Sequence, residues 1–68
     1  MSAFRHDRVR EARIAAGLSR THLGHMIDRG YPTVVAYERG DVCPPIHVLE
    51  KIADATHVPI SAFFDEAA

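Results

Sequence analysis

Two of the five histidines in the chain, His22 and His25, are three residues apart, a spacing that places both side chains on one face of a helix. Imidazole nitrogens bind zinc, but a zinc site takes four protein ligands, or three and an open position. The single cysteine, Cys43, is distant from this pair in the sequence. The pattern favours solvated histidines, and we expect no metal ion or other cofactor.

Cys43 is followed four residues later by His47, and these are the residue types of a nucleophile and its base. Cys43 precedes two prolines in a loop, and so short a chain leaves no room for a cavity of useful size around a substrate. An unreactive loop thiol is the better interpretation. We therefore expect no catalytic residue, no small-molecule ligand and no enzymatic activity.

Arginines dominate the first part of the chain. Residues 1–40 hold seven of them against four acidic residues, a balance of +3, whereas residues 41–68 have a balance of −4, so the net charge is only −1. This asymmetry predicts one face for an anionic partner and one face turned away from it. Arginines near the N-terminus either solvate that end or grip a phosphate: Arg5, Arg8 and Arg10, together with His6.

The length of 68 residues allows one domain, residues 1–68, with a flexible N-terminal arm expected at 1–6 and a flexible C-terminus at 65–68. A hydrophobic content of 47% is typical of a globular protein, and one cysteine cannot form an internal disulfide. The chain shows neither the pattern of a secretory signal nor an apolar run of about 20 residues. We expect a cytoplasmic protein without membrane association.

The signals for the first two helices are local. Asp7 is a suitable cap for a helix over 8–16, and Gly17 is suited to end it. Ser19 is a suitable cap for a second helix that runs to residue 27, before the break at 28–30. The apolar stripes of these two helices are predicted to comprise Val9, Ala12, Ala16, Leu23, Met26 and Ile27.

Two prolines predict the starts of the next two helices. Pro32 opens a helix that ends at Gly40, and Pro45 opens another that His57 closes. The fourth helix is predicted to bury Ile46, Leu49, Ile52, Ala53 and Ala55, and a last turn carries Ile60, Phe63 and Phe64. The expected fold class is all-α, a bundle of five short helices and no sheet.

Residues 19–27 and 32–39 form two short helices joined by a short turn, the helix-turn-helix arrangement that places its second helix in the major groove of DNA. The run from residue 17, "GLSRTHLGHMIDRGYPTVVAYERGDVCPPIHVLEKIADATHVPISAFF", resembles the Cro/repressor family of helix-turn-helix regulators. The similarity extends from about Val9 to Phe64 and implies a lambda-repressor-like DNA-binding domain.

The resemblance implies a role for individual residues. Arg20 and Thr21 fall at the helix end that binds a phosphate, and Arg39 falls where it reaches the DNA backbone. The side of the recognition helix that faces the bases carries Tyr31, Pro32, Thr33, Val35 and Ala36, and Arg29 is an additional candidate. The family buries the position of Tyr37 and uses that of Glu38 to tie the helix end to the rest of the domain.

The base-facing residues depart from the family pattern. Relatives often carry arginine, glutamine or asparagine there, and this helix offers none of these for a bidentate bond to guanine or adenine. We expect readout through apolar contacts of Val35 and Ala36 with thymine methyl groups, hydrogen bonds from Thr33 and Tyr31, and DNA shape. Asp41, just after the helix, would repel a phosphate if it faced one.

Two functions are compatible with these features. The first is a transcriptional repressor that binds double-stranded DNA as a homodimer. The second is an antitoxin-like or scaffold module that holds a protein partner and binds DNA secondarily. Val42, Ile46 and Phe64 are the candidates for a dimer or partner surface. A palindromic operator would favour the first function, and a protein that copurifies would favour the second.

Overall fold

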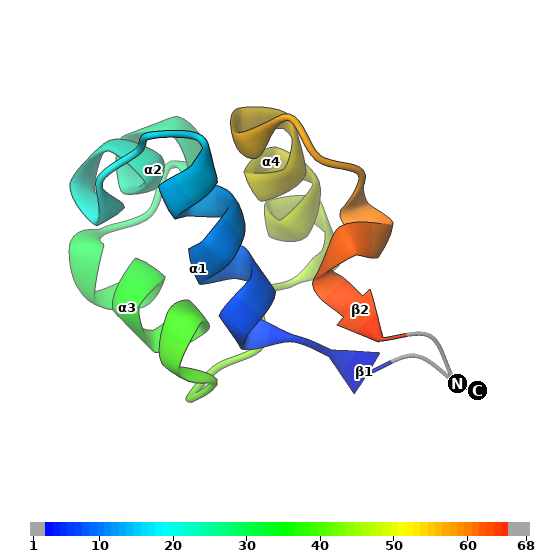
Figure 1. Ribbon diagram of the computed structural model, residues 1–68. Coiled ribbons are helices and arrows are strands. Elements are labelled where there is room, and N and C mark those ends of the chain that lie inside the picture. Colours follow the sequence, from blue (N-terminus) through cyan, green and yellow to red (C-terminus); the bar gives the residue numbers. More distant parts are fainter. Residues whose placement is uncertain (1–2, 66–68) are drawn as a thin grey trace.

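Four α-helices and a terminal 3₁₀ turn make up most of the computed structural model, which describes residues 3–65 (Figure 1). The helices are α1 (His6–Ala15), α2 (Arg20–Ile27), α3 (Tyr31–Arg39) and α4 (Ile46–Thr56), and the 3₁₀ turn is η1 (Ile60–Phe63). Two short strands flank them, β1 (Ala3–Phe4) and β2 (Phe64–Asp65). Residues 1–2 and 66–68, assigned above to flexible ends, lie outside the described part.

Most helix boundaries follow the local signals. The Ser19 hydroxyl accepts a hydrogen bond from the His22 backbone N–H at 3.0 Å, and so caps α2 as predicted. Gly40 ends α3 with a φ of 84°, a conformation in which a side chain would be strained. The prediction that Asp7 caps α1 is wrong, because the helix starts at His6 and Asp7 instead pairs with Arg5.

The core lies where α1, α2, α3, α4 and η1 meet. Its buried hydrophobic residues are Val9, Leu23, Ile27, Val34, Tyr37, Val48, Leu49, Ile52, Ala53, Ala55 and Phe63. The prediction for Ile46 is wrong: this residue is 61% exposed in the first turn of α4, and Val48 is buried in its place. Ala16 and Met26 are also exposed, because they border a surface hollow that no element covers.

The expectation of no sheet is wrong as well. β1 and β2 pair antiparallel, with Ala3 opposite Asp65 and Phe4 opposite Phe64, so the first and last described residues lie side by side (Figure 1). The Phe4 and Phe64 rings meet edge to face, with centroids 6.1 Å apart. Strands of two residues show no sequence periodicity, and their pairing joins segments at opposite ends of the chain.

Candidate nucleic-acid interface

The turn between α2 and α3 is tightly packed. The Arg29 backbone N–H donates to the Gly24 carbonyl at 2.8 Å, and a Cβ on Gly24 would lie 2.6 Å from the Arg29 carbonyl oxygen. Asp28 holds the left-handed conformation with a φ of 60°, which aspartate tolerates better than most residues. Gly24 thus permits the close approach that fixes α3 against α2.

α3 has one buried side and one outward side. Val34, Tyr37 and Glu38 are each 5% exposed or less, in agreement with the structural roles expected for Tyr37 and Glu38. The five predicted base-facing residues are all partly or fully accessible, and we call them the reading side: Tyr31, Pro32, Thr33, Val35 and Ala36. Tyr31 is 51% exposed.

The predicted phosphate-binding residues lie at the start of α2 and at the end of α3. Arg20 and Thr21 occupy the first turn of α2, and Arg39 ends α3 with 71% of its side chain exposed. Arg39 Nε lies 3.7 Å from the Asp41 carboxylate, which therefore sits beside a cation. Arg29, the additional candidate, donates through Nη1 to the carbonyl of Asp28 at 2.9 Å.

Glu38 holds two arginines at once. Arg13 donates to both of its carboxylate oxygens, through Nε at 2.6 Å and Nη2 at 3.2 Å, and Arg20 Nε donates to Oε1 at 3.0 Å. Hydrogen bonding to Glu38, and then to Tyr31, raises the pKa of Arg20 above its usual value. Sequence reasoning missed Arg13, although its position four residues after the buried Val9 placed it on the inner side of α1.

The N-terminal arginines fasten the chain ends. Arg5 Nη1 lies 2.7 Å and Arg8 Nη2 lies 3.2 Å from one oxygen of Asp65, and Arg8 Nη1 donates to the Phe64 carbonyl at 3.0 Å. Arg5 also pairs with Asp7, and this hydrogen bond lowers the pKa of the Asp7 carboxyl. The sequence left two roles open for these arginines, solvation of the N-terminus or binding of a phosphate. The structure adds a third role for Arg5 and Arg8, whose ion pairs with Asp65 join the start of the described chain to its end.

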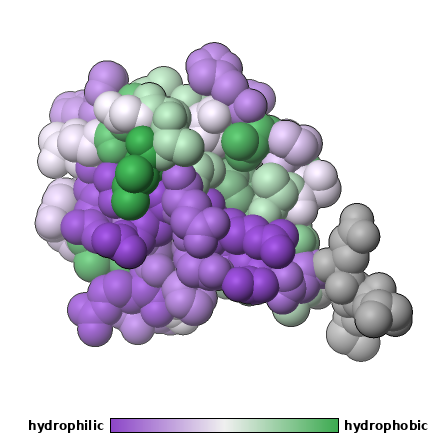
Figure 2. Space-filling view, in the orientation of Figure 1, coloured by the Kyte–Doolittle hydropathy of each residue, from purple (hydrophilic) through white to green (hydrophobic). Residues whose placement is uncertain are grey.

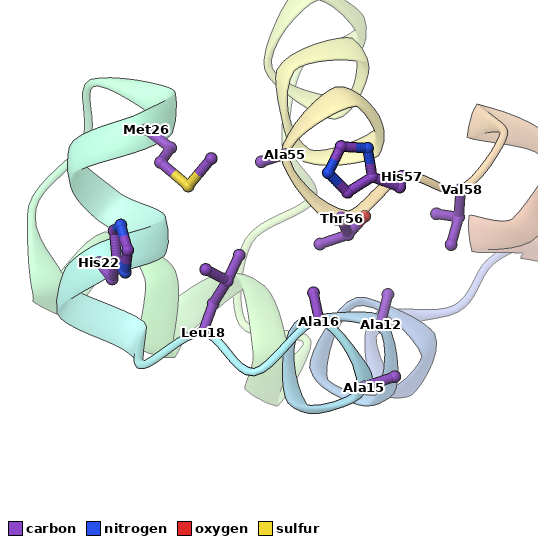
Figure 3. Close-up of a pocket in the computed structure, with 10 residues that line it drawn as sticks. All are labelled: Ala12, Ala15, Ala16, Leu18, His22, Met26, Ala55, Thr56, His57 and Val58. Carbon is purple, nitrogen blue, oxygen red and sulfur yellow. The ribbon is translucent and has the colours of Figure 1, made fainter.

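A separate apolar hollow of about 420 Å³ lies away from α3, between α2 and the C-terminal ends of α1 and α4 (Figure 3). Leu18 and Met26 line it, and His22 and His57 stand on opposite sides (Figure 3). In the view of Figure 2, hydrophobic surface gathers above a band of hydrophilic residues. The expectation that no useful cavity forms in so short a chain is therefore wrong.

The described residues provide no support for a metal site or for a membrane-spanning helix. Within residues 3–65, no three side chains of histidine, cysteine, aspartate or glutamate stand close enough together to hold a metal ion. In the same part of the chain, no helix has both the length and the apolar character to span a bilayer. Cys43 is exposed, with its sulfur 3.7 Å from the Pro44 carbonyl oxygen.

Solved structures share the fold. The restriction-modification controller protein C.AhdI from Aeromonas hydrophila superposes with a TM-score of 0.81 at 29% identity, covering 87% of this chain and 86% of that one. A Vibrio cholerae transcriptional regulator of the HTH_3 family superposes with a TM-score of 0.75 at 28% identity, covering 85% of this chain and 33% of that one. The P22 c2 repressor protein, solved with a synthetic operator, gives 0.81 at 18% identity, covering 90% and 92%, which supports the fold alone.

Sequence comparison gives the family. A protein of Aeropyrum pernix that is named as an HTH-type transcriptional regulatory protein is 35% identical over 48 residues, which is 71% of this chain but only 15% of that protein. The profile of the HTH_3 helix-turn-helix family matches residues 9–63, which include most of α1 and all of α2, α3 and α4. The chain therefore belongs to the HTH_3 helix-turn-helix family of DNA-binding transcriptional regulators.

Proposed function

We propose that this chain binds an inverted repeat in double-stranded DNA as a homodimer and represses a promoter by occupying it. The observation that supports this most is the reading side of α3, which faces away from the core, with Arg20 held on Glu38 and Arg39 as the last residue of the same helix. A helix that presents one accessible side with cations nearby suits a DNA major groove bordered by phosphates.

In this proposal, Arg20, Thr21 and Arg39 bind the phosphates. Glu38 orients Arg20 through Nε, and a guanidinium held in this way has further N–H groups for an anion. Thr21 contributes a hydroxyl in the first turn of α2, where the positive end of the helix dipole also favours a phosphate. Arg39 has to exchange its long contact with Asp41 for a phosphate.

The dimer surface follows α3 directly. Val42 is 51% and Ile46 is 61% exposed, and both lie between the end of α3 and the first turn of α4. Phe64 is half-buried against Phe4, so we assign the seam to Val42 and Ile46. Two copies joined here would bind half-sites about 34 Å apart. The similarity to the restriction-modification controller protein C.AhdI supports a regulatory role for this chain.

A selection experiment tests DNA binding. The protein is incubated with a pool of random duplexes over a series of salt concentrations, and the bound fraction is sequenced. We expect an enriched inverted repeat. Arg20→Ala should weaken binding evenly across sequences and lower the slope of log affinity against log salt by about 1, whereas Arg20→Lys should keep the slope because the charge remains.

Sedimentation of the protein with the selected duplex tests the dimer. We expect two copies for each inverted repeat, and Ile46→Glu should leave one copy on each duplex at protein concentrations where the wild type binds as two. Ile14→Glu is the matched control, because Ile14 is 54% exposed but lies on α1. Equal effects of the two variants would contradict the assigned seam.

The antitoxin-like or scaffold function is the second candidate, and the apolar hollow at Leu18 and Met26 is the observation that favours it. A pool without any enriched sequence, or binding that responds neither to salt nor to Arg20→Ala, would contradict the DNA-binding proposal. The domain would then be a protein-binding module, and surface variants at Met26 would be the next to test.

A further inference from the structure

The apolar hollow between α2 and the C-terminal ends of α1 and α4 takes no part in the proposed DNA binding. Its volume of about 420 Å³ falls within the range of about 300–1,000 Å³ that is usual for small-molecule sites. The floor of the hollow belongs to the core, since Ala55 and Thr56 are buried. Leu18 and Val58 are partly buried and pack against the core residues. The hollow is therefore formed by the fold itself.

The side chains that line the hollow are mostly small and apolar (Figure 3). Seven of the ten are alanine, leucine, methionine or valine, and four of these seven are alanines, which leave the space between the helices unfilled. Among these ten described residues none is acidic. Met26 is 47% exposed at the edge, and its flexible thioether adapts to an apolar group. Such a lining suits a hydrocarbon body and has no carboxylate that would repel an anion.

The polar side chains of the hollow are His22, Thr56 and His57. The Thr56 hydroxyl is already engaged, because it donates to the Ile52 carbonyl at 2.7 Å. The two imidazoles are exposed on opposite sides of the apolar space (Figure 3). An imidazole N–H donates a hydrogen bond, and a carboxylate only accepts them. The polar groups of the hollow therefore complement a carboxylate.

His57 holds its place in an unfavourable backbone conformation. It follows α4 with a φ of 60°, in the left-handed region that a glycine adopts without strain. Strained backbone positions of this kind cluster at ligand clamps and other functional sites. A histidine at this position supplies an imidazole at the edge of the hollow, which a glycine would not.

We propose that the hollow binds a small apolar carboxylate, an acid whose body is an aromatic ring system or an aliphatic chain. The hydrocarbon body packs on Leu18 and Met26, and the carboxylate accepts hydrogen bonds from His22 and His57. The hollow lies away from α3, so this inference does not depend on the proposed function.

Methyl NMR of the intact chain tests the proposal. Met26 is one of two methionines, so labelling of the methionine methyl groups with ¹³C gives a simple spectrum, in which Met26→Leu identifies the Met26 signal. The probes are 2-naphthoate and octanoate, and the neutral alcohols 2-naphthylmethanol and 1-octanol are their controls. We expect at least one acid to shift the Met26 signal saturably and to bind about tenfold or more tightly than its alcohol, the value for a hydrogen bond to a charged group. The tighter acid identifies the body as aromatic or aliphatic.

Matched variants locate the binding. His22→Leu removes a donor and should lower the preference for the acid over its alcohol about tenfold. His25→Leu should keep the preference, because His25 is also exposed on α2 but does not line the hollow. Ala16→Phe should fill the hollow and weaken both the acid and the alcohol, whereas Ile14→Phe, on α1 outside the lining, should weaken neither.

His57→Gly separates the loss of binding from the loss of folding. Without the imidazole, the preference for the acid over the alcohol should fall about tenfold. Without the strained backbone, the variant should at the same time melt at a higher temperature than the wild type. A protein that is more stable and binds the acid less well cannot owe the weaker binding to misfolding.

Three results would overturn the proposal. The first is a Met26 signal that neither acid shifts saturably, and the second is an alcohol that binds as tightly as its acid. The third is an equal loss of preference in His22→Leu and His25→Leu. A random duplex pool without any enriched sequence would overturn the proposed function and leave this inference standing.

Discussion

Arg13 and Glu38 form a buried ion pair that joins the inner side of α1 to the end of the recognition helix. The two side chains are 10% and 2% exposed, and the guanidinium contacts both carboxylate oxygens. Arg13 also donates to the Leu18 carbonyl at 2.9 Å, at the start of the segment that leads to α2. One arginine thus links α1, the segment before α2, and α3.

Removal of one partner of this pair should cost much of the stability of the domain. Arg13→Met leaves the Glu38 carboxylate buried with only Arg20, and the loss of one partner of a buried pair costs about 3–5 kcal/mol. Arg20→Ala should cost less than Arg13→Met, since Arg20 is 35% exposed. Urea denaturation followed by circular dichroism measures both, and equal costs would contradict the central role of Arg13.

Gly24→Ala should destabilise the protein, although alanine is the better helix former by about 1 kcal/mol. The new Cβ would meet the Arg29 carbonyl oxygen at 2.6 Å, so α3 has to shift and the expected cost is about 1–3 kcal/mol. Gly30→Ser is the control, because the nearest atom to a Cβ there is 3.6 Å away and serine is a good N-cap for α3. Thermal melting should show a lower midpoint for Gly24→Ala alone.

His57→Gly should stabilise the protein. His57 ends α4 with a φ of 60°, a conformation that destabilises a residue with a Cβ by about 1–2 kcal/mol. Glycine removes this cost, but it also loses more conformational entropy on folding, which offsets part of the gain. The expected net gain is about 0.5–1 kcal/mol. His25→Gly, also exposed but inside α2, should instead lose about 1 kcal/mol. Chemical denaturation measures the free energy of unfolding of both variants. A change in the same direction for His57→Gly and His25→Gly would contradict the backbone explanation.

Acid should weaken the contact at the start of α1. Hydrogen bonding to Arg5 lowers the pKa of Asp7, so the stabilisation is complete above the ordinary carboxyl pKa of about 4 and disappears as the pH falls through the lower folded value. Asp7→Asn should therefore melt slightly below the wild type at pH 7, and this difference should shrink as the pH falls below about 4. Because both side chains are about 40% exposed, the difference should be small. A constant difference over this range would rule out the ionised contact.

Much of the recognition region was predictable from the sequence. Ser19, Gly17, Gly40 and the two prolines act on their immediate neighbours, so the ends of α2, α3 and α4 followed from local chemistry within about a residue. The family resemblance is confirmed, as is the prediction that the chain is not an enzyme, because the matched family consists of transcriptional regulators. The phosphate and base contacts assigned to individual residues stay predictions.

The sequence by itself determined the helix-turn-helix segments, the family and the apolar character of the recognition helix, because these depend on residue types a few positions apart. The tertiary structure alone decided which charges pair. Arg13 meets Glu38 across 25 positions of the chain, and Arg5 meets Asp65 across 60. The same non-local packing formed the strand pair, exposed Ile46 and pressed Gly24 against Arg29. Such contacts depend on how the elements pack in space, and helical periodicity carries no information on that arrangement.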